Sequence, residues 1–280
     1  MNADQQIQYE NQGFLHLPGI IPAPLVSQVK TAFDGAVERH RPGGKLANGE
    51  AYFDIPDILD VADCFVDLVD LPPLVPLLLA AVGPDIQLNH THARFFPPGP
   101  TFTAPWHSDL ADVIGIDLAH SLHFMVKVHF YFEDLLPDQG CLAFLPGTHR
   151  LPPGPPRSEI APASPAAVKI VPQAGDAVLF NTHLLHMALD NTSPRPRKSL
   201  IYAYSHCWVK NYANAVPADL TRLATTPLRQ QLLGAETEGV SYFHQRYNGA
   251  LQATEHNTLK VAGKKLLKRI LKATSITRRR

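Results

Sequence analysis

The stretch at residues 122–132, LHFMVKVHFYF, alternates polar with apolar side chains and decides the fold class. Lys127 and His129 would share one face of an extended segment, while Val126 and Val128 would share the other. A period of two residues is typical of a β-strand, because successive side chains point to opposite faces of the sheet. We therefore expect a strand here with one apolar face.

Segments on both sides of this stretch extend the pattern. Strands are predicted at GFLHLPGII (13–21), QLNHTHARFF (87–96), GCLAFLPGTHR (140–150), AVKIV (167–171), DAVLF (176–180) and SLIYAYSH (199–206). Helical spacing is found nearer the N-terminus, over residues 24–40 and again over 57–82, with an interruption at Pro72-Pro73. Helices followed by many short strands indicate a mainly β fold, a sandwich or barrel with flanking helices.

The composition is that of a globular protein. Of 280 residues, 45% are hydrophobic and 18% charged, which is enough for a sizeable core, and 26 prolines argue against a simple helix bundle. Cys64, Cys141 and Cys207 form no C-x-x-C motif and suit a reducing compartment. The N-terminus has no signal-peptide pattern, and the most apolar stretch, 71–82, is too short to span a bilayer, so we expect a cytoplasmic protein.

The C-terminal segment 260–280 differs in charge from the rest of the chain. It holds nine Lys or Arg and no acidic residue, which leaves 16 basic against 25 acidic side chains in residues 1–259. One interpretation is a basic amphipathic helix that contacts an anionic membrane surface peripherally. The other is a solvated helix packed on the acidic body. Nucleic acid is not expected as a partner, because the basic run is a single end segment.

Residues that suit a metal site come from two separate segments. In PWHSDL, His107 and Asp109 stand two positions apart, so in an extended segment both side chains point the same way. The segment 175–205 contributes His186 at the end of a predicted strand. Two histidines and one carboxylate are the ligand set of the facial triad that holds Fe(II) and leaves the opposite positions open.

Arg197 opens the following predicted strand and suits the far carboxylate of 2-oxoglutarate, through a two-pronged charged hydrogen bond. Ser199, two residues on, would add a hydroxyl donor on the same face. His183 competes with His186, and Arg195 competes with Arg197. The placement at the strand end favours His186, and the R-K-S sequence at 197–199 favours Arg197.

Five further polar side chains lie on the predicted strands. They are His90, His92, Arg94, Lys127 and His129. They could line a pocket inside a barrel, or they could form the solvated face of a sheet. Both interpretations remain open at the level of sequence.

The motifs NQGFLHLPGII, WHSD, ED…GCLAFLPGTH and GDAVLFNTHLLH occur in this order, with an arginine eleven positions after His186. In these features the chain resembles the phytanoyl-CoA dioxygenase family of iron- and 2-oxoglutarate-dependent oxygenases. The resemblance implies a double-stranded β-helix, the cupin-like jelly roll, over a single domain at 1–259. It also implies that Fe(II) is bound by His107, Asp109 and His186, that Arg197 holds 2-oxoglutarate, and that O2 is consumed.

The implied reaction is hydroxylation of an unactivated C–H bond, with release of succinate and CO2. The substrate would be a small metabolite, a lipid or a lipid-linked sugar. Family members that halogenate replace the metal carboxylate with a small residue, and this chain retains Asp109. The alternatives are a jelly-roll isomerase or hydrolase that uses a metal without 2-oxoglutarate, and a non-catalytic jelly roll that binds a ligand.

Overall fold

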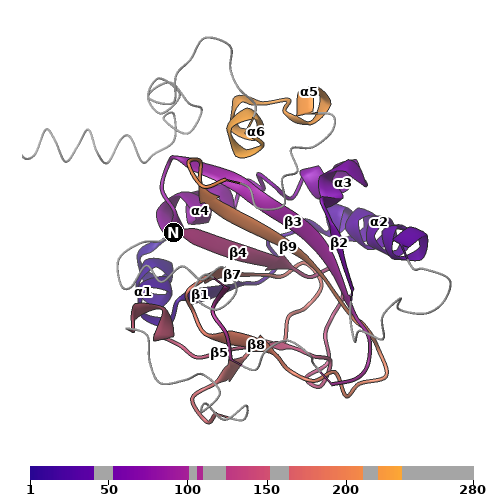
Figure 1. Cartoon of the computed structure of the whole chain (residues 1–280), viewed down its shortest axis with the longest axis vertical. Coiled ribbons are helices and arrows are strands. Elements are labelled where there is room, and N and C mark those ends of the chain that lie inside the picture. Colours follow the sequence, from indigo (N-terminus) through magenta and orange to yellow (C-terminus); the bar gives the residue numbers. More distant parts are fainter. Residues whose placement is uncertain (41–52, 101–105, 110–123, 152–163, 211–219, 235–280) are drawn as a thin grey trace, which may run out of the picture.

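Two antiparallel sheets that face each other form the centre of the molecule (Figure 1). The computed structural model describes residues 1–40, 53–100, 106–109, 124–151, 164–210 and 220–234. The larger sheet has the strand order β1-β7-β4-β9-β3-β2 and the smaller the order β6-β5-β8. This is the jelly roll, or double-stranded β-helix, that the family resemblance implies.

The strands are short except for two long ones in the larger sheet. That sheet consists of β1 Phe14–Leu17, β2 Phe53–Pro56, β3 Ile86–Phe96, β4 Met125–Phe130, β7 Ala177–Asn181 and β9 Arg197–His206. The smaller sheet consists of β5 Leu142–Phe144, β6 Val168–Lys169 and β8 His186–Ala188. β9 pairs with β3 on one side and β4 on the other, so these three strands form the middle of the larger sheet.

Helices cover the outer face of the larger sheet, away from β5 and β8 (Figure 1). The helical elements are α1 Ala3–Gln12, α2 Ala23–His40, η1 Ile58–Asp60, α3 Asp63–Val66, α4 Val75–Ala81, η3 Thr148–Arg150, α5 Leu220–Leu223 and α6 Pro227–Leu232. Phe33 of α2 packs in one core cluster with Phe130 of β4 and Tyr202 of β9. The Tyr202 hydroxyl also donates to the Phe65 carbonyl of α3 at 2.6 Å, so the helix layer is fixed to the sheet by a polar contact as well.

A second apolar cluster fills part of the space between the sheets. The Phe144 ring of β5 stacks on Phe14 of β1 at 4.7 Å and contacts Phe180 of β7 at 5.2 Å. This contact joins the smaller sheet to the larger one at the end next to β1. The remainder of the interior carries polar side chains and contains the site described below.

Most of the predicted elements are present. The helix expected at 24–40 is α2, and the strands expected at 87–96 and 199–206 are β3 and β9. α1, β2, α5 and α6 were not predicted from the sequence. α1 begins at a capping box in which Asn2 accepts from the Gln5 backbone N–H and the Gln5 side chain accepts from the Asn2 backbone N–H.

One predicted position is wrong. His186 was placed at the end of the strand that begins near residue 176, but β7 ends at Asn181 and a turn follows. His186 begins β8, which belongs to the other sheet. The segment 260–280 lies completely outside the described residues, so the domain boundary at 259 stays a prediction. In the described part of the chain, no helix has the length and apolar character needed to cross a membrane.

Candidate metal centre

His107 and His186 face each other across an isolated antiparallel bridge. The backbone N–H of His107 donates to the His186 carbonyl at 3.1 Å, and that of His186 donates to the His107 carbonyl at 3.0 Å. The two imidazole rings lie 4.5 Å apart between centroids. The backbone pairing therefore holds two histidines from distant parts of the chain side by side.

The orientation of the His186 ring is set by its own turn. Its Nδ1 lies 2.9 Å from the Leu184 carbonyl oxygen, which can only accept, so Nδ1 carries the proton and Nε2 keeps a lone pair. Burial lowers the pKa of His186 to about 4, although the nearby Asp109 carboxylate acts in the opposite direction. At neutral pH the ring is therefore uncharged, which is the form that binds a metal.

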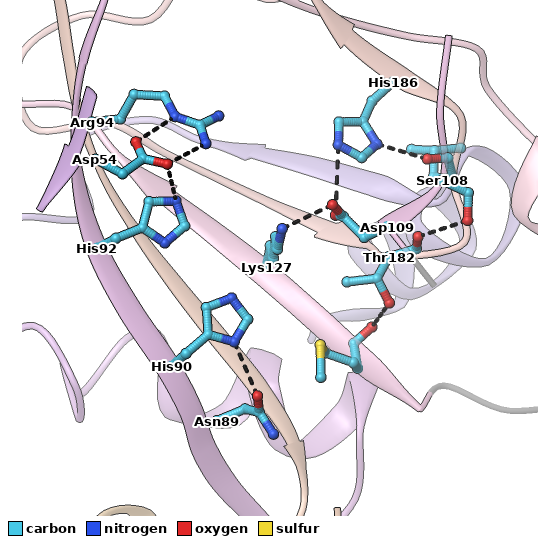
Figure 2. A network of polar contacts seen from close by, with 12 residues as sticks. Asp54, Asn89, His90, His92, Arg94, Ser108, Asp109, Lys127, Thr182 and His186 are labelled. Atoms are coloured by element: carbon cyan, nitrogen blue, oxygen red, sulfur yellow. Dashed lines mark hydrogen bonds and ion pairs between the residues drawn. The ribbon is translucent and has the colours of Figure 1, made fainter. Parts of the chain in front are cut away.

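Asp109 projects between His186 and Lys127 of β4 (Figure 2). Its Oδ1 lies 2.9 Å from Lys127 Nζ, while its Oδ2 accepts no hydrogen bond and lies 3.6 Å from His186 Nε2. Burial raises the pKa of Asp109, but the positive charge of the adjacent Lys127 more than offsets this and holds the pKa below its usual value. The residue is an ionised, mostly buried carboxylate with one oxygen available.

The ligand atoms of His107, Asp109 and His186 all lie within 4.8 Å of one another. Neutral imidazole nitrogens with one carboxylate oxygen and no thiolate match the preference of Fe(II) and similar divalent ions. A buried carboxylate oxygen without a hydrogen-bond partner is costly unless a cation or donor satisfies it. The three residues thus fit a divalent metal ion by position and by chemistry.

Arg197 and Ser199 lie at the start of β9 and are completely buried, at 1% and 0% exposure. The Arg197 guanidinium donates to the Gly140 carbonyl and lies over the Phe96 ring at 5.2 Å. Its Nε and the Ser199 Oγ have no hydrogen-bond partner, and no carboxylate of the described residues pairs with the guanidinium. A buried cation beside an unused hydroxyl suits the carboxylate of a small anion.

Gly140, which supports Arg197, was not singled out in the sequence. Its φ is +64°, and a Cβ at this position would lie 2.5 Å from Phe96 Cε1. The backbone therefore approaches the Phe96 ring as closely as it does only because residue 140 has no side chain. The glycine that begins GCLAFLPG was the only signal in the sequence for this support of Arg197, but a glycine before a strand indicates only a turn.

The structure also places the alternative candidates. His183 is not part of the group of three ligand atoms, and Arg195 is exposed in the turn before β9. The polar residues of β3 and β4 are not a solvated sheet face, because His90 and His129 are only 5% and 4% exposed.

We call the inner-face side chains His90, His92, Arg94, Lys127 and His129 the polar wall. Figure 2 shows the first four of them. Asp54 of β2, which was not predicted, binds Arg94 of this wall with two hydrogen bonds of 2.9 and 2.8 Å.

A jelly roll in which two imidazoles and a carboxylate converge between the sheets defines a non-haem metal-dependent enzyme. The family model of phytanoyl-CoA dioxygenase (PhyH) matches residues 9–199, more than half of the sequence. The chain belongs to this family and is an Fe(II)- and 2-oxoglutarate-dependent oxygenase. The isomerase, hydrolase and non-catalytic alternatives are not supported.

Similar proteins agree with this assignment. L-proline trans-4-hydroxylase of Streptomyces griseoviridis is 24% identical over 235 residues, which cover 72% of this chain and 85% of that protein. HygX of Streptomyces hygroscopicus, solved with nickel and 2-oxoglutarate, has a TM-score of 0.61 at 17% identity, over 78% of this chain and 93% of HygX. The carbocyclase SnoK from nogalamycin biosynthesis has a TM-score of 0.61 at 18% identity, over 79% and 90% of the two chains. The two structures share the jelly-roll fold with this protein.

Proposed function

We propose that this oxygenase hydroxylates an unactivated C–H bond of a small molecule, with His107, Asp109 and His186 as the iron ligands. The observation that carries the proposal is the convergence of these three ligand atoms within 4.8 Å. Arg197 and Ser199 are proposed to bind the carboxylate of 2-oxoglutarate that is remote from the metal. This role is supported by their unsatisfied Nε and Oγ atoms in a buried site.

The site residues have separate tasks in this reaction. When bound, Fe(II), 2-oxoglutarate and O2 supply the oxidising chemistry, in which 2-oxoglutarate becomes succinate and CO2 and the substrate gains a hydroxyl group. The Leu184 carbonyl keeps the proton on His186 Nδ1, so that Nε2 stays available to the metal. Lys127 occupies Asp109 Oδ1 and leaves Oδ2 as the free carboxylate oxygen.

The surroundings of the triad limit the access of water. Trp106, which precedes His107, is buried at 2% exposure and packs with Leu145 and Met187. Ser108 is fully buried and donates to the Thr182 carbonyl at 3.1 Å, which fixes the backbone between His107 and Asp109. An enclosed site of this kind protects a reactive oxidising species from side reactions.

Hydroxylation of a small molecule is the outcome that the relatives favour. One relative by sequence, L-proline trans-4-hydroxylase, is named for this reaction on an amino acid, and HygX was solved with hygromycin B. Retention of Asp109 agrees with hydroxylation rather than halogenation, because a halide would need the position on the metal that the Asp109 carboxylate takes. SnoK and the epimerase SnoN show that the fold also supports ring closure and epimerisation.

The test is the variant His107→Ala, with His183→Ala as its matched control. We expect His107→Ala to lose at least about 100-fold in metal affinity, because removal of a direct ligand should cost at least as much as removal of a residue that only supports one. Formation of succinate with Fe(II), 2-oxoglutarate and O2 should be abolished with it. His183→Ala, in the neighbouring turn, should keep both properties.

Two measurements are needed: calorimetric titration of the metal-free protein with Ni(II), and succinate formation followed by mass spectrometry. Undiminished turnover in His107→Ala would contradict the assignment of the triad. Loss of metal binding in His183→Ala would show that His183, and not His186, supplies the second imidazole.

A further inference from the structure

The polar wall is built from matched positions on three neighbouring strands. His90 of β3 and Lys127 of β4 both pair with Ala203 of the central strand β9. Directly paired residues in an antiparallel sheet point to the same face. His90 and Lys127, both seen in Figure 2, therefore project to the same inner face on either side of the small Ala203 side chain.

The next two rows continue this polar surface. His92 and His129 both pair with Ile201, and Arg94 pairs with Ser199. On β3, β4 and β9 these rows thus offer hydrogen-bonding groups with one large aliphatic side chain, Ile201. On the far side of β4, Phe180 of β7 borders Lys127, and its ring lies 4.8 Å from the His186 ring between centroids. An alkyl chain would have to desolvate these groups without satisfying them, so this wall suits a polar ligand rather than a lipid tail.

The histidines of the wall do not supply positive charge. Burial, followed by the nearby charge of Lys127, lowers the pKa of His90 to about 2. Burial likewise lowers the pKa of His92 to about 3, with Asp54 acting in the opposite direction. Both rings are therefore neutral hydrogen-bonding groups, and His90 Nδ1 already binds Asn89 Oδ1 at 3.0 Å.

The charge of the wall comes from Arg94 and Lys127. Arg94 is neutralised by its two hydrogen bonds to Asp54. Lys127, whose side chain is 15% exposed, has its salt bridge to Asp109, the carboxylate that the proposed metal also uses. Within the described residues, no second carboxylate forms a salt bridge with Lys127.

Binding of the metal would change the balance of charge around Lys127 and Asp109. A divalent ion and Lys127 bring three positive charges, against one negative charge from Asp109. The carboxylate of 2-oxoglutarate that binds the metal offsets one more, and one positive charge is left at a mostly buried position. Uncompensated charge in such a place is expensive, so the loaded site should favour a ligand that carries a negative charge.

We propose that the substrate is a small organic acid whose carboxylate binds Lys127 Nζ, while its polar groups lie against His90 and His92. This inference rests on the proposed function, because it assumes that iron and 2-oxoglutarate occupy the adjacent site. It excludes lipids and neutral or cationic sugars as the preferred substrates. The carboxylate on Lys127 has one other source, the metal-binding carboxylate of 2-oxoglutarate itself, and the experiment separates the two.

The experiment measures binding to full-length protein loaded with Ni(II) and 2-oxoglutarate, by isothermal titration calorimetry. The probes are small amino and hydroxy acids, each paired with its primary amide, beginning with L-proline and L-prolinamide. Neutral glycosides and hygromycin B serve as uncharged and cationic comparisons. We expect the tightest ligand to be an acid that binds at least about tenfold more tightly than its amide, as a charge-assisted hydrogen bond would give.

Variants assign this preference to Lys127. Lys127→Met should reduce the preference of acid over amide to less than about threefold, whereas Lys127→Arg should retain most of it. Lys198→Met is the matched control, because Lys198 lies on the outer side of β9, where its Nζ is 2.6 Å from Asp34. It should keep the wild-type preference.

Several results would overturn the proposal. One is a neutral or cationic compound as the tightest ligand of the wild-type protein, and another is an acid preference that persists unchanged in Lys127→Met. A third is a tenfold loss of 2-oxoglutarate affinity in Lys127→Met with the acid preference intact, which would assign Lys127 to the cosubstrate. The preference of acid over amide is measured on the wild-type protein first. The proposal can therefore be contradicted even if a variant misfolds. Failure of the wild type to bind Ni(II) would count against the proposed function instead.

Discussion

The two faces of strand β4, in the middle of the larger sheet, are both buried, yet they are built from opposite kinds of residue. On the outer face of β4, Val126, Val128 and Phe130 pack in the core cluster that includes the helix layer, and all three are 0% exposed. On the inner face of the same strand, Lys127 and His129 lie beside the candidate metal centre. Adjacent residues of one strand thus serve two different purposes.

The difference shows what each face contributes. The outer face buries apolar surface without polar atoms, which is the main source of folding stability. The inner face holds charged and polar atoms without full hydrogen bonding, including His129 Nδ1, Arg197 Nε and Ser199 Oγ. Such groups destabilise the metal-free protein and are expected where a ligand completes the site. Substitutions on the two faces should therefore separate stability from activity.

Phe130→Ala should have the largest effect on stability. The ring is fully buried and meets Tyr202 edge-on at 5.1 Å, so its removal leaves a cavity and should lower the free energy of unfolding by about 3–5 kcal/mol. Urea unfolding measures this, and Phe130→Leu, which keeps most of the volume, should cost less than about 1.5 kcal/mol. Affinity of the folded protein for 2-oxoglutarate should not change. A large loss of affinity with intact stability would contradict the division between the faces.

Arg197→Met should weaken 2-oxoglutarate binding without loss of stability, which is the opposite of the result expected for Phe130→Ala. Loss of a buried charged hydrogen bond to a carboxylate should weaken 2-oxoglutarate binding by about 2–4 kcal/mol. The stability of the metal-free protein should stay the same or increase, because a buried cation without a carboxylate partner is removed. Calorimetric titration with 2-oxoglutarate and urea unfolding measure the two effects. The exposed Arg195→Met is the matched control, and equal losses in both variants would remove Arg197 from the site.

Gly140→Ala should lower both the stability of the protein and its affinity for 2-oxoglutarate, each to a smaller degree. The left-handed φ of +64° and the contact of 2.5 Å with Phe96 should together cost about 2 kcal/mol of stability. The Phe96 ring would move, and with it the support of Arg197, so 2-oxoglutarate affinity should also fall. Gly35→Ala in helix α2 is the control and should not destabilise the protein. Unchanged 2-oxoglutarate binding in Gly140→Ala would show that Arg197 does not depend on this support.

The pH dependence of stability tests the protonation state of the wall histidines His90 and His92. His90 and His92 have folded-state pKa values of about 2 and 3, below the value of 6.5 expected in the unfolded chain. As pH falls below about 6.5, the unfolded chain binds protons that the folded protein does not. The free energy of unfolding should decrease by up to about 1.4 kcal/mol per pH unit for each histidine, and this stability returns above pH 6.5.

Urea unfolding of the metal-free protein at pH 7, 6 and 5 measures this slope. The double variant His90→Gln, His92→Gln should have a shallower dependence in the same interval. An equal slope in the variant would mean that the wall histidines are protonated in the folded state, contrary to their burial.

Local patterns were sufficient for most of the strands. The alternation in 122–132 and in β3 is strong because each strand has two chemically different faces, and the glycine and proline residues of 140–150 mark its turn. β2 and β8 were missed because strands of four and three residues are too short to show a period. α1 was missed because its ten residues are mostly polar, and its start depends on a capping box rather than on an apolar face.

The sequence alone determined the family, the jelly roll and the identity of the candidate triad, because order, spacing and residue type are properties of the chain itself. Only the tertiary structure decided that the polar residues of β3 and β4 face the interior, that His186 begins a strand of the second sheet, and that Lys127 meets Asp109. An alternating strand has the same pattern whether its polar face meets water or an enclosed site. The elements packed against each face decide between the two, and these come from distant parts of the chain.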